Sequence, residues 1–145
     1  MSEVFGNILI IDDNTDVLLA AKLFLKQHFQ SVQVEKNPTL IPTLLKNNSY
    51  DVILLDMNFT KDVASGKEGF YWLDKILELD PQAVVVFITA FGDVDKAVQA
   101  IREGATDFVL KPWQNEKLLA TVSTAMKLRY TRREADQLRV QKQQL

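Results

Sequence analysis

Two adjacent carboxylates, Asp12 and Asp13, follow the apolar run Ile8–Ile11 in the segment NILIIDDN. Side by side the two negative charges repel each other, and burial beside an apolar run raises the cost of ionising either group. Such a pair is unfavourable unless a cation or a cationic side chain lies between its members. The sequence therefore predicts that other charged groups of the fold converge on this point.

The elements that must position this pair follow from apolar, β-branched runs that alternate with segments of helical period. This alternation is typical of βαβ units, so we predict an α/β fold with a five-stranded parallel sheet, helices on both faces and an extended last helix. The predicted strands are Ile8–Ile11, Val32–Glu35, Val52–Leu55, Val84–Ile88 and Asp107–Leu110. The predicted helices cover the apolar face from Val17 to Phe29, the regions near Thr39–Lys46 and Gly69–Leu79, a segment from an Asp93 cap to Gly104, and Asn115–Leu145.

The carboxyl ends of parallel strands line one edge of a sheet, where α/β proteins bind their ligands. Alone, an aspartate after a strand is more often a turn former or helix cap than a ligand. Here polar residues stand at four strand ends, which predicts a single site in which three carboxylates, a lysine and a hydroxyl meet. Oxygen ligands of this kind favour Mg²⁺. The residues are Asp12, Asp13, Asp56, Thr89 and Lys111.

The composition is that of one globular domain. The chain has 145 residues, of which 47% are hydrophobic, and a net charge of -2, so it can build a core of its own. The absence of cysteine excludes disulfides, thiolate metal sites and cysteine nucleophiles. No apolar run is long enough to span a bilayer and Met1–Glu3 does not open a secretory signal, so we expect a cytoplasmic protein without membrane contact. The single histidine, His28, has no partner cluster.

Two segments depart from the regular alternation. The stretch Asn58–Gly69 has no apolar period and is interpreted as a long loop beside the predicted site. The end of the last helix, Lys127–Leu145, carries six basic and two acidic residues on an otherwise acidic chain. Its apolar spacing predicts either a weak coiled coil or a simple linker. The apolar positions are Leu128, Ala135, Leu138 and Leu145, interrupted by Thr131 and Lys142.

Together these motifs resemble the receiver domain of bacterial two-component response regulators over residues 6–127. The likeness is carried by ILIIDDN, DVILLDMN and VVVFITAFGDVDKAVQAIREGATDFVLKPW, in which an acidic pair, a central aspartate, Thr-Ala and Lys-Pro occur in the order of the family. The last run is most similar to the nitrogen-regulator (NtrC) class, which places the receiver before a sigma-54-activating ATPase and a DNA-binding domain. The resemblance implies a (βα)₅, flavodoxin-like fold, with residues 128–145 as a helical linker to an output domain.

The resemblance also implies the chemistry of the site. Asp56 is the expected phosphoacceptor, and Lys111 is expected to pair with the phosphoryl oxygens. In-line attack by a carboxylate nucleophile requires neutralisation of charge, which Mg²⁺ and Lys111 would supply. The expected ligands of Mg²⁺ are Asp12, Asp13, Asp56 and the backbone carbonyl of Asn58.

The same resemblance implies a switch. Thr89 is expected to hydrogen-bond the phosphoryl group, Phe108 to change rotamer with Thr89, and the Lys111–Pro112 peptide bond to be cis. One departure is plain, because Thr60 stands where the family usually has proline and extra residues follow it up to Lys67. This loop borders the site and could alter dephosphorylation or partner choice.

The predicted function is regulation by phosphorylation, with no enzyme activity beyond the domain's own phosphorylation and dephosphorylation. We expect a sensor histidine kinase as donor, sigma-54-dependent transcription as output, no nucleic-acid contact by this segment, and a weak homodimer through the last helix and the face 91–103. Two alternative functions are consistent with parts of the sequence. A phosphatase of the haloacid-dehalogenase kind needs a general-acid aspartate where Asn58 stands, and a docking module without phosphorylation would not need the complete set of site residues.

Overall fold

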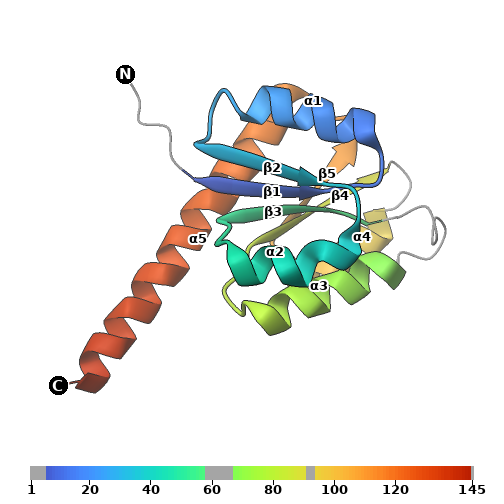
Figure 1. Ribbon diagram of the computed structural model, residues 1–145. Coiled ribbons are helices and arrows are strands. Elements are labelled where there is room, and N and C mark those ends of the chain that lie inside the picture. Colours follow the sequence, from blue (N-terminus) through green and yellow to red (C-terminus); the bar gives the residue numbers. More distant parts are fainter. Residues whose placement is uncertain (1–5, 58–66, 91–93, 145) are drawn as a thin grey trace.

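The computed structural model describes residues 6–57, 67–90 and 94–144. These residues form a five-stranded parallel sheet in the order β2-β1-β3-β4-β5 with helices on both faces (Figure 1), as predicted. The strands are β1 (Asn7–Ile11), β2 (Ser31–Glu35), β3 (Val52–Asp56), β4 (Val85–Ala90) and β5 (Asp107–Lys111). The helices are α1 (Thr15–Leu25), α2 (Ile41–Asn47) after a 3₁₀ turn η1 (Pro38–Leu40), α3 (Lys67–Leu79), α4 (Val94–Arg102) and α5 (Asn115–Gln144).

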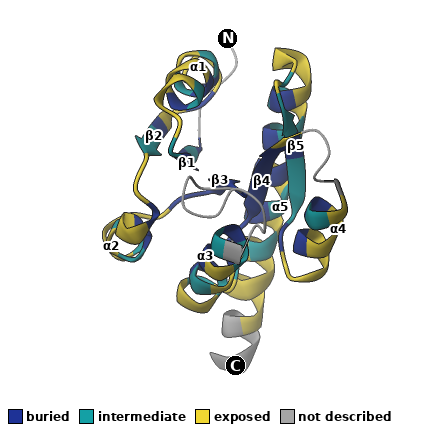
Figure 2. Ribbon diagram, turned by 90° about the vertical axis from the view of Figure 1, so that its right-hand side faces the viewer, coloured by how far each residue is buried: buried dark blue, intermediate teal, exposed yellow. Residues whose placement is uncertain are grey.

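The strands divide the core into two clusters because successive side chains point to opposite faces of the sheet. In β1, Ile8 and Ile10 pack with α1 and α5, whereas Leu9 and Ile11 pack with α2, α3 and α4. Figure 2 shows the buried strands β3 and β4 between helices whose outer faces are exposed. Coverage of both faces explains why these central strands are mostly apolar, whereas the edge strand β2, SVQVE, alternates with polar residues.

The register of the central strands brings their carboxyl ends to the same level. β3 lies between β1 and β4, pairing Leu55 with Ile11 on one side and Asp56 with Ile88 on the other. The carboxyl ends of β1, β3 and β4 are therefore neighbours at one edge of the sheet, where the predicted site residues were expected.

Two helix ends illustrate what the sequence could and could not predict. Gly104 has φ +120°, and the amides of Gly104 and Ala105 donate to the carbonyls of Ile101 and Ala100. This is a Schellman motif, so the predicted stop at Gly104 is confirmed. By contrast, α1 ends at Leu25, although Phe29 belongs to the same buried cluster. The apolar spacing up to Phe29 therefore indicates which residues are buried, but it does not indicate where the helix ends.

Several predictions lie outside the described residues. These are the Asp93 cap, the loop from Asn58 with Thr60, the carbonyl of Asn58 as a ligand, and Phe91 at the start of the face 91–103. Near the loop, α3 begins at Lys67, two residues before the predicted start at Gly69.

Helix α5 is much longer than the other described helices and extends well past the edge of the sheet (Figure 1). Its first turns bury Leu118, Val122 and Met126 against the sheet, and Leu128 packs against the same cluster. Leu138, in contrast, is 60% exposed. Within the described ranges, no helix combines the length and hydropathy needed to span a bilayer.

Candidate functional site

Three carboxylates meet at the carboxyl edge of the sheet. Asp12 and Asp13 follow β1, and Asp56 is the last residue of β3. One oxygen from each lies within 4.8 Å of the others. Asp12 is 0% and Asp56 2% exposed, whereas Asp13 is half-buried. The three carboxylates therefore converge as predicted. The desolvation penalty is largest for Asp12 and Asp56, which are almost completely buried.

Lys111, the last residue of β5, reaches this cluster. Its Nζ lies 2.9 Å from Asp12 Oδ2 and 3.5 Å from Asp56 Oδ1. Burial lowers the pKa of Lys111, but attraction to Asp56 and the hydrogen bond and charge of Asp12 together outweigh burial, so the net pKa is raised. The ammonium group thus stays charged at neutral pH. The Lys111–Pro112 bond is cis, as expected from the resemblance.

The charge balance of the cluster tests whether a divalent cation fits. The Lys111 ammonium supplies one positive charge against three carboxylates, and two of these carboxylates are buried where water screens their repulsion poorly. The donors are all hard oxygens, as Mg²⁺ prefers, and half-buried Asp13 leaves room for bound waters. The described residues therefore fit Mg²⁺, with Asp12, Asp13 and Asp56 as ligands.

Asp12 also forms a local turn. Its Oδ1 accepts the N–H of Asn14 at 2.9 Å, while its other oxygen faces Lys111. The cap of α1 is Asn14, whose side chain accepts the N–H groups of Asp16 and Val17. The sequence analysis did not single out Asn14, although an asparagine just before an apolar helical period is a common signal for a cap. Because Asn14 caps the helix, both aspartates remain available to the cluster.

Thr89 lies on β4, the strand next to Asp56, and Phe108 lies one strand further away, on β5. Thr89 is 1% exposed, and its hydroxyl donates to Met57 Sδ at 3.7 Å. Met57 is the residue directly after Asp56. The β4–β5 register pairs Phe108 with Phe87, two residues before Thr89. Phe108 is half-buried against the cluster of α2, α3 and α4. The structure thus places Thr89 beside the site and Phe108 on the neighbouring strand β5, and the switching roles of both residues stay predictions.

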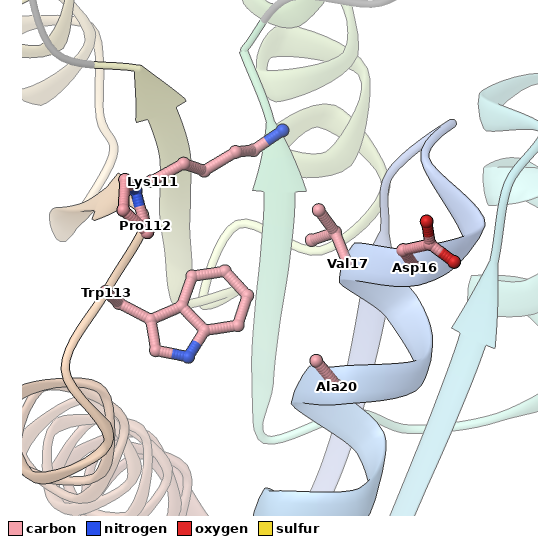
Figure 3. A pocket seen from close by; sticks show the side chains of 6 residues that line it. All are labelled: Asp16, Val17, Ala20, Lys111, Pro112 and Trp113. Carbon is pink, nitrogen blue, oxygen red and sulfur yellow. The ribbon is translucent and has the colours of Figure 1, made fainter.

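A pocket of about 440 Å³ opens beside the carboxylates, between α1 and the segment after β5 (Figure 3). Figure 3 shows the Trp113 ring across from Ala20, while the Lys111 side chain extends toward the end of β3. The sequence analysis missed this pocket because its two walls are far apart in the chain. The lining residues are Asp16, Val17, Ala20, Lys111, Pro112 and Trp113.

With this geometry established, comparison with known proteins identifies the family. The family model of the response regulator receiver domain matches residues 8–123. The chain therefore belongs to the receiver-domain family of response regulators, whose members are regulatory domains.

Curated relatives are longer proteins. The response regulator protein PilR of Pseudomonas aeruginosa is 31% identical over 121 residues, which cover 83% of this chain and 26% of PilR. The response regulator protein TodT of Pseudomonas putida is 29% identical over 128 residues, which cover 88% of this chain and 54% of TodT. The chain thus spans about half the length of TodT and about a quarter of PilR.

Solved structures agree with the fold. The N-terminal signal receiver domain of a two-component response regulator from Bacteroides fragilis is 44% identical, with a TM-score of 0.77 and coverage of 86% of this chain and 98% of that one. NtrX from Brucella abortus, solved in complex with ADP, is 25% identical with a TM-score of 0.83, covering 94% of this chain and 29% of that one.

Proposed function

We propose that this receiver domain is switched by phosphorylation of Asp56 and transmits the change to a downstream output module. The observation that carries the proposal is the position of Lys111, whose ammonium contacts Asp12 and Asp56 at once. A cation shared between a candidate nucleophile and a candidate metal ligand is suited to bind the oxygens of an incoming phosphoryl group.

In this proposal Asp12, Asp13 and Asp56, with the backbone carbonyl of Asn58, hold Mg²⁺. The bound ion supplies positive charge that reduces repulsion between carboxylate and phosphoryl oxygens. An Asp56 oxygen attacks the phosphorus atom, and the bond between phosphorus and the leaving group breaks, with the electron pair departing on the leaving group. Lys111 donates hydrogen bonds to the phosphoryl oxygens as they move toward Asp56.

The switch follows from the new charge on Asp56. The Thr89 hydroxyl exchanges the weak acceptor Met57 Sδ for a phosphoryl oxygen, which is a far stronger acceptor. Phe108 then changes rotamer, and the face 91–103 is remodelled. A chain of this kind acts as a regulator, with only its own phosphorylation and dephosphorylation as chemistry.

For partners, we propose a cytoplasmic setting with a sensor histidine kinase as phosphodonor. We also propose that residues 6–127 are the receiver and residues 128–145 the linker to an ATPase and a DNA-binding domain that drive sigma-54-dependent transcription. The response regulator protein PilR and NtrX, which was solved in complex with ADP, are both much longer than this chain, which supports a receiver followed by further domains. A weak homodimer through α5 and the face 91–103 completes the proposal.

Mass spectrometry of the intact protein tests the phosphorylation. Acetyl phosphate with Mg²⁺ should add one base-labile phosphoryl group, Asp56→Asn should abolish the addition, and omission of Mg²⁺ should greatly reduce it. Asp74→Asn, which removes an exposed carboxylate on α3, is the matched control and should be phosphorylated normally. Undiminished phosphorylation of Asp56→Asn would place the nucleophile elsewhere.

A further inference from the structure

Three arginines join the middle of α5 to the edge of the sheet opposite the carboxylate site. Arg129, Arg132 and Arg133 lie three and four residues apart and so share one side of the helix. Their partners belong to two separate connections, the one before β3 and the one before β4. We call these residues and their partners the arginine anchor. The partners are Asp80, the carbonyl of Ala83, and Asp51.

Arg129 is the most buried of the three arginines. Its side chain is 6% exposed, and its Nη2 lies 3.0 Å from Asp80 Oδ2. Asp80 itself is held in the turn after α3, because its Oδ1 accepts the N–H of Gln82 at 3.1 Å. A guanidinium group buried to this extent is costly without its carboxylate, so this pair resists separation.

Arg132 and Arg133 fix the next turn of the helix. Arg132 Nη1 donates to the Ala83 carbonyl at 3.0 Å, and Arg133 Nη1 lies 3.3 Å from Asp51 Oδ1. The Asp51 side chain is 8% exposed and cannot follow a moving partner, since its Oδ2 accepts the N–H of Asn7 at 2.8 Å. The Asp51 N–H in turn donates to the Asn7 carbonyl at 2.8 Å.

An ordinary surface pair lies on the same helix for comparison. Arg139 Nη2 is 3.5 Å from Asp136 Oδ1, one turn away, and both side chains are more than half exposed. Such a pair contributes little and fixes nothing outside its own helix. The anchor differs from it in reach, because Arg132 and Arg133 contact residues 49 and 82 positions away in the chain. It also differs in the burial of Arg129 and Asp51, although the Arg133 side chain is 48% exposed.

We propose that the arginine anchor fixes the direction of the α5 extension relative to the sheet, so that whatever follows residue 144 is carried on a rigid arm. The anchored connections lead into β3 and β4, the two strands that carry predicted site residues. Asp51 immediately precedes β3, which ends at Asp56, and Ala83 lies two residues before β4, which contains Thr89. The arm is therefore attached to the amino ends of the strands that carry the predicted phosphoacceptor and its switch residue.

The anchor can be tested without phosphorylation, so its failure is distinct from failure of the proposed function. The chain has no cysteine, which allows spin labels at Lys46→Cys on α2 and Gln137→Cys on α5, both exposed positions. Pulsed electron paramagnetic resonance then gives the distribution of distances between body and arm. The whole 145-residue chain is used throughout.

The proposal predicts a narrow distribution for the doubly labelled protein and one at least about twofold wider when Arg129, Arg132 and Arg133 are all replaced by Gln. Arg139→Gln is the control and should leave the width unchanged. Should the triple variant not fold, Arg132→Gln with Arg133→Gln keeps the buried Arg129 pair and should widen the distribution to a smaller extent. A wide distribution in the labelled parent protein, or equal widths in parent and folded variants, would overturn the proposal.

Discussion

Lys111 defines the site at the level of single residues. Its ammonium contacts two of the three carboxylates, Asp12 and Asp56, and so relieves part of the repulsion that the sequence predicted around Asp12. The sequence alone predicts that these residues share one site, because each stands at the carboxyl end of a predicted parallel strand. The sequence could not predict which carboxylate Lys111 approaches most closely, because that depends on the height of each strand end.

Replacement of Asp13 by Asn should separate the metal role from a structural one. Without Mg²⁺ the variant should be more stable by roughly 1 kcal/mol, because one of three mutually repelling charges is gone. It should also bind Mg²⁺ more weakly, which isothermal titration can measure alongside urea unfolding in EDTA. Lower stability in EDTA together with unchanged Mg²⁺ affinity would mean that Asp13 has only a structural role.

The raised pKa of Lys111 predicts a dependence of stability on alkaline pH. A cationic group with a raised pKa in the folded state stabilises the protein fully below its unfolded pKa, near 10.5, and loses this contribution as the pH rises through the folded value. In EDTA, Lys111→Met should lower the free energy of unfolding by roughly 2 kcal/mol at pH 8. The difference between the two proteins should shrink above pH ~10.5.

Urea titrations of both proteins from pH 8 to pH ~11 measure this difference. The pKa of Tyr50, raised by burial, and that of Tyr130, raised by burial and by Asp51, act in both proteins and cancel. A difference that stays constant across the range would show that the charge of Lys111 does not stabilise the cluster.

At the level of elements, periodicity predicted the order and type of the strands and helices, because both faces of the sheet had to be covered. It could not locate close backbone contacts. Gly69 shows why, since a Cβ built there would lie 2.5 Å from the Met57 carbonyl oxygen and 2.9 Å from Met57 Cα. In the sequence, Gly69 is predicted only as the end of a loop. In the structure, α3 packs at Gly69 against the backbone of Met57, the residue after β3.

Gly69→Ala should therefore destabilise the protein although alanine favours helices. The gain in helix propensity is about 0.5–1 kcal/mol, whereas a forced shift of packed backbone costs about 1–3 kcal/mol. Because Met57 follows Asp56, the shift should also slow phosphorylation by acetyl phosphate. Urea unfolding and mass spectrometry measure the two effects, with the exposed Asp74→Ala on α3 as control. A variant as stable and as reactive as the parent would show that α3 can move away freely.

At the level of the whole molecule, α5 is both part of the core and an extension from it. The helical length of the tail was predictable, since nothing between Asn115 and Gln144 interrupts it. The attachment of the tail to the sheet was not predictable. In the sequence Arg129 and Arg133 are indistinguishable from solvent-exposed linker residues, and only the fold places Asp80 and Asp51 beside them. Of the apolar positions predicted for a coiled coil, Leu128 packs against the core while Leu138 is exposed.

Truncation should reveal where the folded unit ends. A fragment ending at Met126 loses Leu128 and leaves Asp51 and Asp80 without their arginines, so it should be less stable than the full chain by roughly 2–4 kcal/mol. A fragment ending at Gln137 keeps the anchor and should lie within about 1 kcal/mol of the full chain. Equal stability of the two fragments would show that the anchor adds nothing to folding.

The proposed dimer is tested on the same fragments. Sedimentation equilibrium should detect weak self-association of the full chain and less in the fragment ending at Gln137, which lacks Leu138 and Leu145. Phosphorylation should shift the association constant of the full chain. Equal monomer populations for both proteins, with and without acetyl phosphate, would leave the tail as a linker only.

The central claim is that Asp56 is the phosphoacceptor, and chemical mapping of the acyl phosphate tests it most directly. After reaction with acetyl phosphate and Mg²⁺, borohydride reduces the acyl phosphate to an alcohol with release of inorganic phosphate, which converts the modified aspartate to homoserine. Peptide mapping by mass spectrometry should find homoserine at position 56 and unmodified aspartate at positions 12 and 13. Homoserine at position 12 or 13, or phosphorylated protein with none at position 56, would contradict the account.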